Sequence, residues 1–273
     1  MRVGGEDWRS IARQCYDRSL SPSFIVMSRI PTSIEETIEQ AKAATKEALS
    51  AGNKLVQVEL VIPEIALQSQ SLALEFTRLL ESYGEGLRVI FPDTGAAMLA
   101  RRNWGKTVFK ISDLGSRFTS VEENISPEDT AYLVVCPSSV EIGAVEKLSQ
   151  IANDKPIVLL IPQLEDVSIV GIGYAARQLR DRFIASIESA YYFRPLESGF
   201  VIRSYPGPWE VWLDKEEGYE SIAQQSSKPG GEELERLILK ATNPTNETVE
   251  SAQPVKKRGL LGDLKRLLRA LNQ

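Results

Sequence analysis

Residues 131–163, AYLVVCPSSVEIGAVEKLSQIANDKPIVLLIPQ, decide the fold. The stretch begins with an apolar run, Ala131 to Cys136, and ends with another, Ile157 to Ile161. Both runs have the length of a buried strand. Between them a helix is predicted from Ser139 to Asn153, because apolar residues recur at helical spacing: Ile142, Val145, Leu148 and Ile151. A strand, a helix and a second strand predict a βαβ unit with parallel strands.

The same alternation extends in both directions from this unit. Upstream, we predict helices at 33–50, 66–83 and 94–103, and strands at 55–62, 87–91 and 107–111. Residues 112–128 are predicted to be loop. Downstream, a helix at 174–186 precedes three closing strands at 191–194, 200–205 and 210–213. The fold class expected is therefore α/β, with a doubly wound, mostly parallel sheet and a short antiparallel excursion at its C-terminal end.

Four predicted strands end at a proline, namely Ile62-Pro63, Phe91-Pro92, Cys136-Pro137 and Ile161-Pro162. Proline cannot continue a central ladder, so each marks the point where the chain leaves the sheet. A polar residue follows each proline: Glu64, Asp93, Ser138 and Gln163. In an open parallel sheet these positions form the carboxyl edge, where ligands usually bind.

Two segments near this edge are candidate ligand sites. Asp93 and Thr94 open a helix, whose N-terminus attracts anions, but Asp93 can also cap its own helix and repel phosphate. The stretch from Gly171 and Gly173 to Ala176 fits G-x-G-x-x-A, yet it lies too far beyond a strand for a dinucleotide fold, so a tight turn is the competing interpretation. Arg177, with Arg180 and Arg182, forms either an anion patch or a solvated helix face. The weak ligand-binding set is Asp93, Thr94, Gln163, Gly171, Gly173 and Arg177.

Neither the acidic residues near the carboxyl edge nor the cysteines are predicted to be catalytic, and the chain has no histidine. Glu165 and Asp166 could hold Mg²⁺ or act as acid and base with Glu64 and Asp93, but caps and turns explain such acids equally well. The 273 residues include no histidine and two cysteines, which excludes histidine-dependent triads and Cys/His zinc sites. Cys136 reads as a small buried hydrophobe. We predict no catalytic residue, no metal and no cofactor.

The chain is predicted to have four parts: an N-terminal extension (1–28), an α/β domain (29–223), a short helix with a flexible linker (224–255) and a basic amphipathic helix (256–273). The extension is either a mis-assigned start before Met27 or a loosely ordered segment. Net charge is −5, but residues 256–273 carry +5 and the remainder −10, which argues against nucleic acid as a partner.

The last helix is the candidate contact with a partner or membrane. Its leucines occupy one face and its basic residues the other, and the contact set is Leu260, Leu261, Leu264, Lys265, Arg266, Leu267, Leu268, Arg269 and Leu271. Anionic lipid, an acidic protein groove and the domain itself are three possible targets. An aromatic corner, Tyr205-Pro206-Gly207-Pro208-Trp209 with Trp212, is either a second partner surface or packing at the sheet edge.

Several short motifs follow one another in a recognisable order along 29–213. They include Val61-Ile62-Pro63-Glu64, Phe91-Pro92-Asp93-Thr94-Gly95, Asn103-Trp104-Gly105, Ile161-Pro162-Gln163-Leu164-Glu165-Asp166, Tyr192-Phe193-Arg194-Pro195-Leu196 and Tyr205-Pro206-Gly207-Pro208-Trp209. In this order the chain resembles a domain-of-unknown-function family of cyanobacteria and plastids. Plant members of that family include an assembly factor that is named for low photosystem II accumulation, and a plastid protein in which the domain is fused to an adenylate kinase. Where the family pattern has Asn-Pro-Gln, this chain has Ile161-Pro162-Gln163.

The resemblance implies a photosynthetic context and supplies no catalytic residue. We therefore expect a non-enzymatic auxiliary factor for assembly or stability of thylakoid complexes, whose partner is a photosynthetic complex subunit or assembly intermediate. The expected location is cytoplasmic and peripheral on the thylakoid surface, because no apolar signal core or spanning run is found. The alternative is a protein or enzyme that binds a nucleotide or phosphate metabolite at the carboxyl edge.

Overall fold

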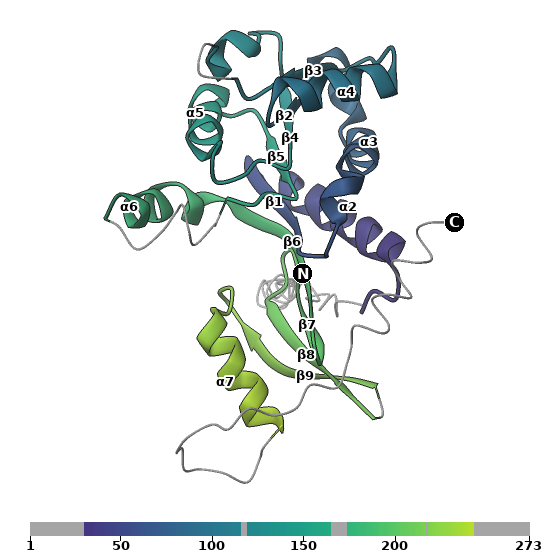
Figure 1. Cartoon of the computed structure of the whole chain (residues 1–273), viewed down its shortest axis with the longest axis vertical. Helices are drawn as coiled ribbons and strands as arrows, with labels where there is room; N and C mark the ends of the chain where they lie inside the picture. The colour runs from purple at the N-terminus through teal and green to yellow at the C-terminus, as the bar shows by residue number, and fades with distance from the viewer. Residues whose placement is uncertain (1–29, 116–118, 165–173, 217, 243–273) are drawn as a thin grey trace, which may run out of the picture.

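A computed structural model describes residues 30–115, 119–164, 174–216 and 218–242 (Figure 1). Within these ranges one nine-stranded sheet has the order β3-β2-β4-β5-β1-β6-β7-β8-β9. The strands are β1 (Leu55–Leu60), β2 (Leu87–Phe91), β3 (Lys110–Asp113), β4 (Ala131–Val135), β5 (Ile157–Leu160), β6 (Glu188–Leu196), β7 (Gly199–Ser204), β8 (Trp209–Lys215) and β9 (Gly218–Gln225). Strands β1 to β6 pair in parallel and β6 to β9 antiparallel, which confirms the predicted fold class.

Helices cover both faces of the sheet (Figure 1). On one face lie α2 (Ile34–Ser50), α3 (Ser69–Leu79) and α4 (Thr94–Trp104). On the other lie α5 (Ile142–Ala152), α6 (Tyr174–Arg182) and, further along, α7 (Gly231–Thr242). We call these faces the α2 side and the α5 side. Among the described residues, no helix is both long and apolar enough to cross a membrane.

Strand alternation divides the core between the two sides. On β1, Val56, Val58 and Leu60 are buried beneath the helices of the α2 side. Helix α2 can approach this layer closely because the residues it turns inward are small, with Ala41 and Ala48 fully buried. The α5 side has its own cluster, in which Leu148 of α5 and Phe183 pack on Leu159 of β5.

Several predicted elements differ from the observed ones. The helix predicted over 66–83 is three pieces: 3₁₀ turns η1 (Ile65–Gln68) and η2 (Glu81–Gly86) flank α3, and Gly84 has a positive φ of 51°. The predicted loop 112–128 contains the end of β3 and a 3₁₀ turn, η3 (Val121–Asn124), begun by a Ser120–Glu123 capping box. The helix predicted over 174–186 ends at Arg182, and η4 (Ile184–Ser186) follows.

The strands at the C-terminal end are longer and more numerous than predicted. Strand β6 extends over nine residues, and β9 was missed altogether. Its sequence, GYESIAQQ, has few of the large apolar residues that signal a strand, because five of its eight residues are exposed. The four proline-terminated strands are confirmed, since β1, β2, β4 and β5 each end one to three residues before a proline.

Candidate functional site

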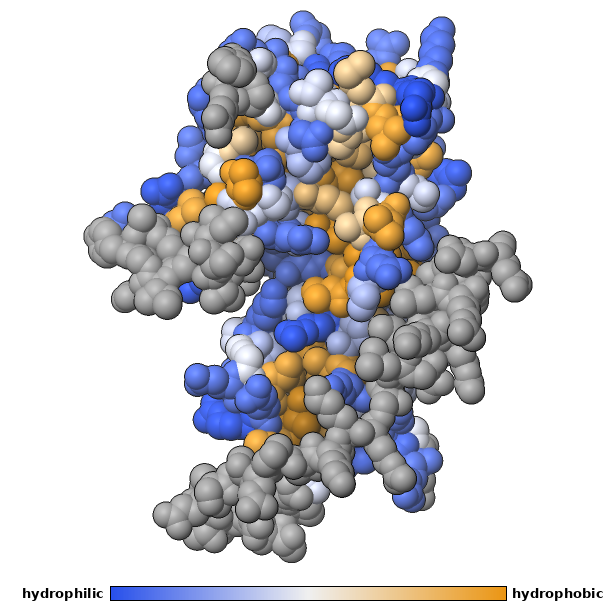
Figure 2. All heavy atoms as spheres, in the orientation of Figure 1, coloured by the Kyte–Doolittle hydropathy of each residue, from blue (hydrophilic) through white to orange (hydrophobic). Residues whose placement is uncertain are grey.

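The α5 side of the sheet has a hollow between α6 and α7, with a volume of about 1050 Å³. Its floor is formed by β1 and β6, and its walls include α6 and the segment between β9 and α7. We call it the α6–α7 groove; its polar lining includes Gln57, Glu59, Arg180, Ser189, Arg203 and Lys228. Figure 2 shows a hydrophilic surface between these two helices. The groove is a concave site with a largely polar lining.

Strand β1 explains why the floor is polar. Its residues alternate, so Gln57 and Glu59 point away from the buried Val56 and Val58 and toward the α5 side. Glu59 lies beside Tyr192 of β6 in the parallel register. The polar face of a central strand must meet solvent, a ligand or hydrogen-bonding partners within the protein, because an unpaired buried polar group is costly.

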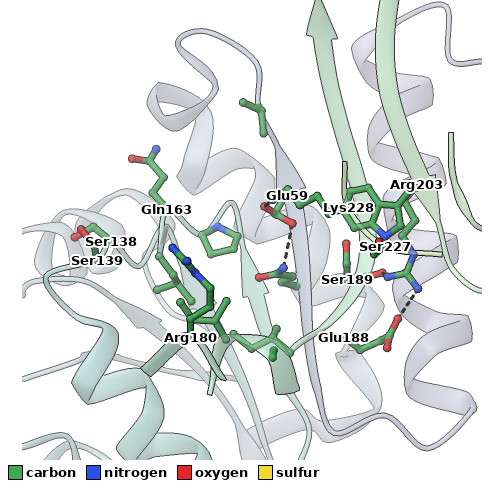
Figure 3. A pocket seen from close by; sticks show the side chains of 18 of the residues that line it. Glu59, Ser138, Ser139, Gln163, Arg180, Glu188, Ser189, Arg203, Ser227 and Lys228 are labelled. Carbon is green, nitrogen blue, oxygen red and sulfur yellow. Dashed lines mark hydrogen bonds and ion pairs between the residues drawn. The ribbon is translucent and has the colours of Figure 1, made fainter. Parts of the chain in front are cut away.

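Two ion pairs order the side of the groove nearest α7 (Figure 3). Lys228 Nζ donates to Glu59 Oε1 at 2.8 Å, and Gln57 Nε2 donates to Glu59 Oε2 at 3.0 Å. Arg203 Nη2 donates to Glu188 Oε1 at 2.6 Å, and its Nη1 donates to the backbone oxygen of Ser189 at 2.6 Å. The charges of Glu59 and Glu188 are therefore both compensated.

Aromatic rings support the same cations. Lys228 Nζ lies 4.6 Å from the centroid of the Tyr192 ring, and Arg203 Cζ lies 5.6 Å from that of Trp209. Such cation–π contacts hold a basic side chain in place. Burial raises the pKa of Tyr192, and the nearby Lys228 opposes that rise. The phenol is thus neutral at physiological pH and serves as a packing surface.

Arg180 and Ser189 differ from these paired groups. Among the described residues of the groove, Arg180 forms no ion pair, and Figure 3 shows its side chain rising from α6 into the hollow. Ser189 is 6% exposed, and its hydroxyl has no hydrogen-bond partner among the residues that the structure describes. The groove therefore contains an unpaired cation and a buried hydroxyl without a partner.

The carboxyl edge reaches this groove at one place. Ser138 and Gln163, which follow β4 and β5, form a parallel bridge and both line the hollow. The preceding residues Cys136 and Ile161 have positive φ values of 48° and 52°, which turn the chain out of the sheet just before each proline. The prediction that polar residues gather at this edge is thus correct for Ser138 and Gln163.

The other predicted ligand residues are not brought to the groove. Asp93 Oδ1 accepts the N–H of Ala96 at 2.9 Å, so Asp93 caps α4 as the competing interpretation proposed, and neither it nor Thr94 lines the hollow. Gly171, Gly173, Glu165 and Asp166 lie outside the described residues, as do the side chain of Arg177 and the whole contact set from Leu260 to Leu271. Whether these residues bind anything stays a prediction.

The aromatic corner packs within the sheet. Trp209 is 5% exposed and lies 4.9 Å from Tyr192 between ring centroids. Trp212 stacks on Phe200 at 6.1 Å, and its indole N–H donates to Glu210 Oε2 at 2.8 Å. A role for this corner as a partner surface stays a prediction. In the described ranges, no group of three or more carboxylate, thiol or imidazole side chains is placed to hold a metal ion.

One pattern in the sequence indicates the groove. In Leu55–Leu60, Gln57 and Glu59 interrupt an otherwise apolar strand at every second position. A strand at the centre of a doubly wound sheet is normally apolar on both faces, so this alternation indicates an uncovered patch. Ser189, Arg203 and Lys228 had no comparable signal, because only the strand order places them beside β1.

Comparison with known proteins identifies the family. A family model described as a domain of unknown function, DUF1995, matches residues 31–236. The chain belongs to the DUF1995 family. The match extends past residue 213, where the resemblance was expected to end, and includes β9 and the first half of α7. No curated protein and no solved structure matches the chain. The domain boundaries at residues 28, 223 and 255 stay predictions.

Proposed function

We propose that this DUF1995 protein is a non-enzymatic auxiliary factor that binds its partner or ligand in the α6–α7 groove. The observation that carries the proposal is the polar floor of β1, a central strand whose Gln57 and Glu59 face a groove instead of a helix in the part of the chain that the structure describes. The groove presents ordered charges, hydroxyls and an amide, which suit recognition. The absence of histidine removes the commonest acid–base and nucleophile partners.

The proposed context is the assembly or stability of photosynthetic complexes. Support comes from the ordered motifs between Val61 and Trp209, which resemble the family of cyanobacteria and plastids. In this proposal the protein works at the cytoplasmic face of thylakoids, and residues 256–273 contact an anionic lipid surface or a complex subunit. The +5 charge of that segment, set against an acidic remainder, supports an anionic target.

A complementation experiment tests the groove and the context together. The gene is deleted in its native host, and assembled photosystem II is quantified against total chlorophyll after return of wild type, Arg180→Gln or Arg102→Gln. Arg102 is an exposed arginine on α4, on the opposite side of the sheet. We expect wild type and Arg102→Gln to restore photosystem II and Arg180→Gln to fail. A deletion strain with normal photosystem II would refute the photosynthetic context.

The membrane contact of residues 256–273, the predicted basic helix, is tested separately by flotation with thylakoid vesicles. Full-length protein and a chain ending at residue 255 are compared at low and high salt. We expect flotation that depends on residues 256–273 and weakens as salt screens the basic face. Equal flotation of the two chains would remove the terminal segment from the proposal.

A second candidate function is the binding of a nucleotide or phosphate metabolite. It is favoured by Ser138 and Gln163, which bring the carboxyl edge of the sheet to one end of the groove. A thermal-shift screen against nucleotides and sugar phosphates tests it, since a ligand at 100 times its Kd stabilises the native state by about 2.7 kcal/mol. No shift with any compound would count against this second function.

A further inference from the structure

The charges of the α6–α7 groove leave one positive charge uncompensated. Three cations line it, Arg180, Arg203 and Lys228, together with two acids, Glu59 and Glu188. Both acids are already paired, at 2.8 Å with Lys228 and at 2.6 Å with Arg203. Among the described residues that line the groove, no uncompensated carboxylate therefore repels an anion that approaches Arg180, within a protein whose overall charge is −5.

The hydroxyl of Ser189 is a second, independent indication that the groove binds a ligand. The backbone oxygen of Ser189 accepts from Arg203 Nη1, but the hydroxyl is buried and makes no hydrogen bond to another described residue. Buried hydroxyls are normally satisfied, so one on the floor of a concave site indicates a missing partner atom. Its neighbour across the β1–β6 ladder is Gln57, whose amide group is held on Glu59.

We propose that the groove binds a small soluble molecule whose oxyanion, a phosphate or a carboxylate, contacts Arg180, while another polar atom of the same molecule hydrogen-bonds with the Ser189 hydroxyl on the far side of the groove (Figure 3). The inference rests on the proposed function, because it takes the groove to be the binding site. The guanidinium of arginine matches the geometry of phosphate and carboxylate and donates to both oxygens at once. Ser139 and Gln163 at the carboxyl-edge end offer further hydrogen-bonding groups for the remainder of the ligand.

The size of the groove agrees with such a ligand. Its volume of about 1050 Å³ lies just above the range of small-molecule sites, roughly 300–1,000 Å³. The walls are already ordered by the two ion pairs and the rings under Lys228, so little side-chain freedom is lost on binding.

The test is calorimetric titration of the full-length protein with inorganic pyrophosphate and, in a second arm, with citrate. The first probe reports a phosphate site and the second a carboxylate site. Wild type is compared with Arg180→Gln, Ser189→Ala and Arg102→Gln. The last variant removes one positive charge on the α2 side and leaves the basic terminal segment intact, so it controls for net charge and non-specific attraction.

We expect at least one probe to bind wild type and Arg102→Gln equally, and Arg180→Gln to weaken that binding at least tenfold, as for loss of a charged hydrogen bond. Ser189→Ala should also weaken it, while the melting temperature of the unliganded protein stays unchanged or rises. The proposal is overturned if neither probe binds, if both arginine variants weaken binding equally, or if Ser189→Ala binds as wild type does.

These outcomes separate the inference from the proposed function. If Arg180→Gln fails in complementation but neither probe binds, the groove is used and its ligand is not an oxyanion. If a probe binds as expected but Arg180→Gln restores photosystem II, the oxyanion site is supported and the auxiliary role of the groove is refuted.

Discussion

At the scale of single residues, Asp129 shows how a buried charge is held. Its side chain is fully buried and accepts hydrogen bonds from Arg88 at 2.5 and 3.1 Å, from Lys110 at 3.0 Å and from the N–H of Ser126 at 2.8 Å. Burial alone would raise the pKa of Asp129, but these donors outweigh it and the pKa lies below its usual value. The carboxylate thereby joins β2, β3 and the turn before β4 at the amino edge of the sheet.

We expect Asp129→Asn to lower the free energy of unfolding by about 3 kcal/mol, because it leaves Arg88 buried beside a neutral group. Since the folded pKa is depressed, this stabilisation is present above the unfolded value of about 3.9 and is lost as pH falls through the folded pKa. Urea unfolding at pH 7 and at acid pH measures both effects. Glu122→Gln, which removes an exposed pair with Lys147, is the control and should change stability by less than about 0.5 kcal/mol. A loss below about 1 kcal/mol for Asp129→Asn would contradict this account.

At the thiol of Cys136 burial outweighs hydrogen bonding, which is the reverse of the balance at Asp129. The thiol lies at the end of β4, where burial raises its pKa to about 11 and a hydrogen bond with Ser69 opposes that rise. At neutral pH its thiolate fraction should be ~300-fold below that of a free cysteine with a pKa of about 8.5. In a Cys15→Ser background we expect Cys136 to resist iodoacetamide in the folded protein and to react at the normal rate in urea. Rapid alkylation of the folded chain would argue that this end of β4 is open.

At the scale of elements, β7 and β8 approach unusually closely at Gly199. A Cβ atom built there would lie 1.9 Å from the backbone oxygen of Trp212. We therefore expect Gly199→Ala to force the two strands apart and to cost more than ~2 kcal/mol, which lowers Tm by about 5 °C or more for a domain of this size. Gly143→Ala in α5 is the matched control: a Cβ there meets nothing within 4 Å, so helix propensity should make it neutral or stabilising by up to ~1 kcal/mol. Equal melting temperatures for the two variants would refute the close approach.

Helix α7 depends on one buried leucine. Leu234 is 7% exposed and packs in a cluster with Tyr192, Trp209 and Val211, whereas Leu239 is 59% exposed. Leu234→Ala should cost about 2–3 kcal/mol, and we expect the loss to appear mainly as faster amide hydrogen exchange in α7 and β9. Leu239→Ala should leave exchange unchanged. Protection of α7 that survives Leu234→Ala would mean that the partly buried Leu237 and Ile238, or the ion pair between Lys228 and Glu59, hold this part of the chain.

Elements with strong periodicity were predictable and irregular ones were not. Helix α5 and strands β4 and β5 follow directly from apolar spacing, and the prolines after the strands correctly indicated where the chain leaves the sheet. Helix 66–83 was predicted as one piece because apolar spacing does not register the change to 3₁₀ turns on either side of α3. Gln163 was found from its position after β5, whereas Ser189 and Lys228 needed tertiary contacts that no local pattern contains.

At the scale of the whole molecule, the order of the strands in the sheet could not be predicted from the sequence. Alternating strands and helices predict a parallel sheet, but nothing local states that β1 lies between β5 and β6. That order depends on long-range packing, in which the buried residues of β1 meet helices from one side while Gln57 and Glu59 line the groove on the other. The site is therefore a product of topology more than of any motif.

The central place of β1 also sets the smallest unit that folds. A chain ending at residue 187 keeps five parallel strands but removes β6 to β9, so β1 becomes an exposed edge. An exposed apolar edge favours aggregation. We expect this truncated chain to be insoluble or to unfold without cooperativity, as measured by circular dichroism during thermal denaturation. A sharp, reversible transition in the truncated chain would show that the parallel half is an independent domain.

The same strand order has a consequence during protein synthesis. β1 is made first, but its neighbours β5 and β6 begin only at Ile157 and Glu188. At translation rates of about 5–20 residues per second, the nascent strand waits roughly 5–20 s for its first partner, and its apolar residues stay unpaired throughout that interval. The ribosome therefore exposes β1 well before this strand can join a sheet, and holdase chaperones should engage nascent chains that end between residues 60 and 157.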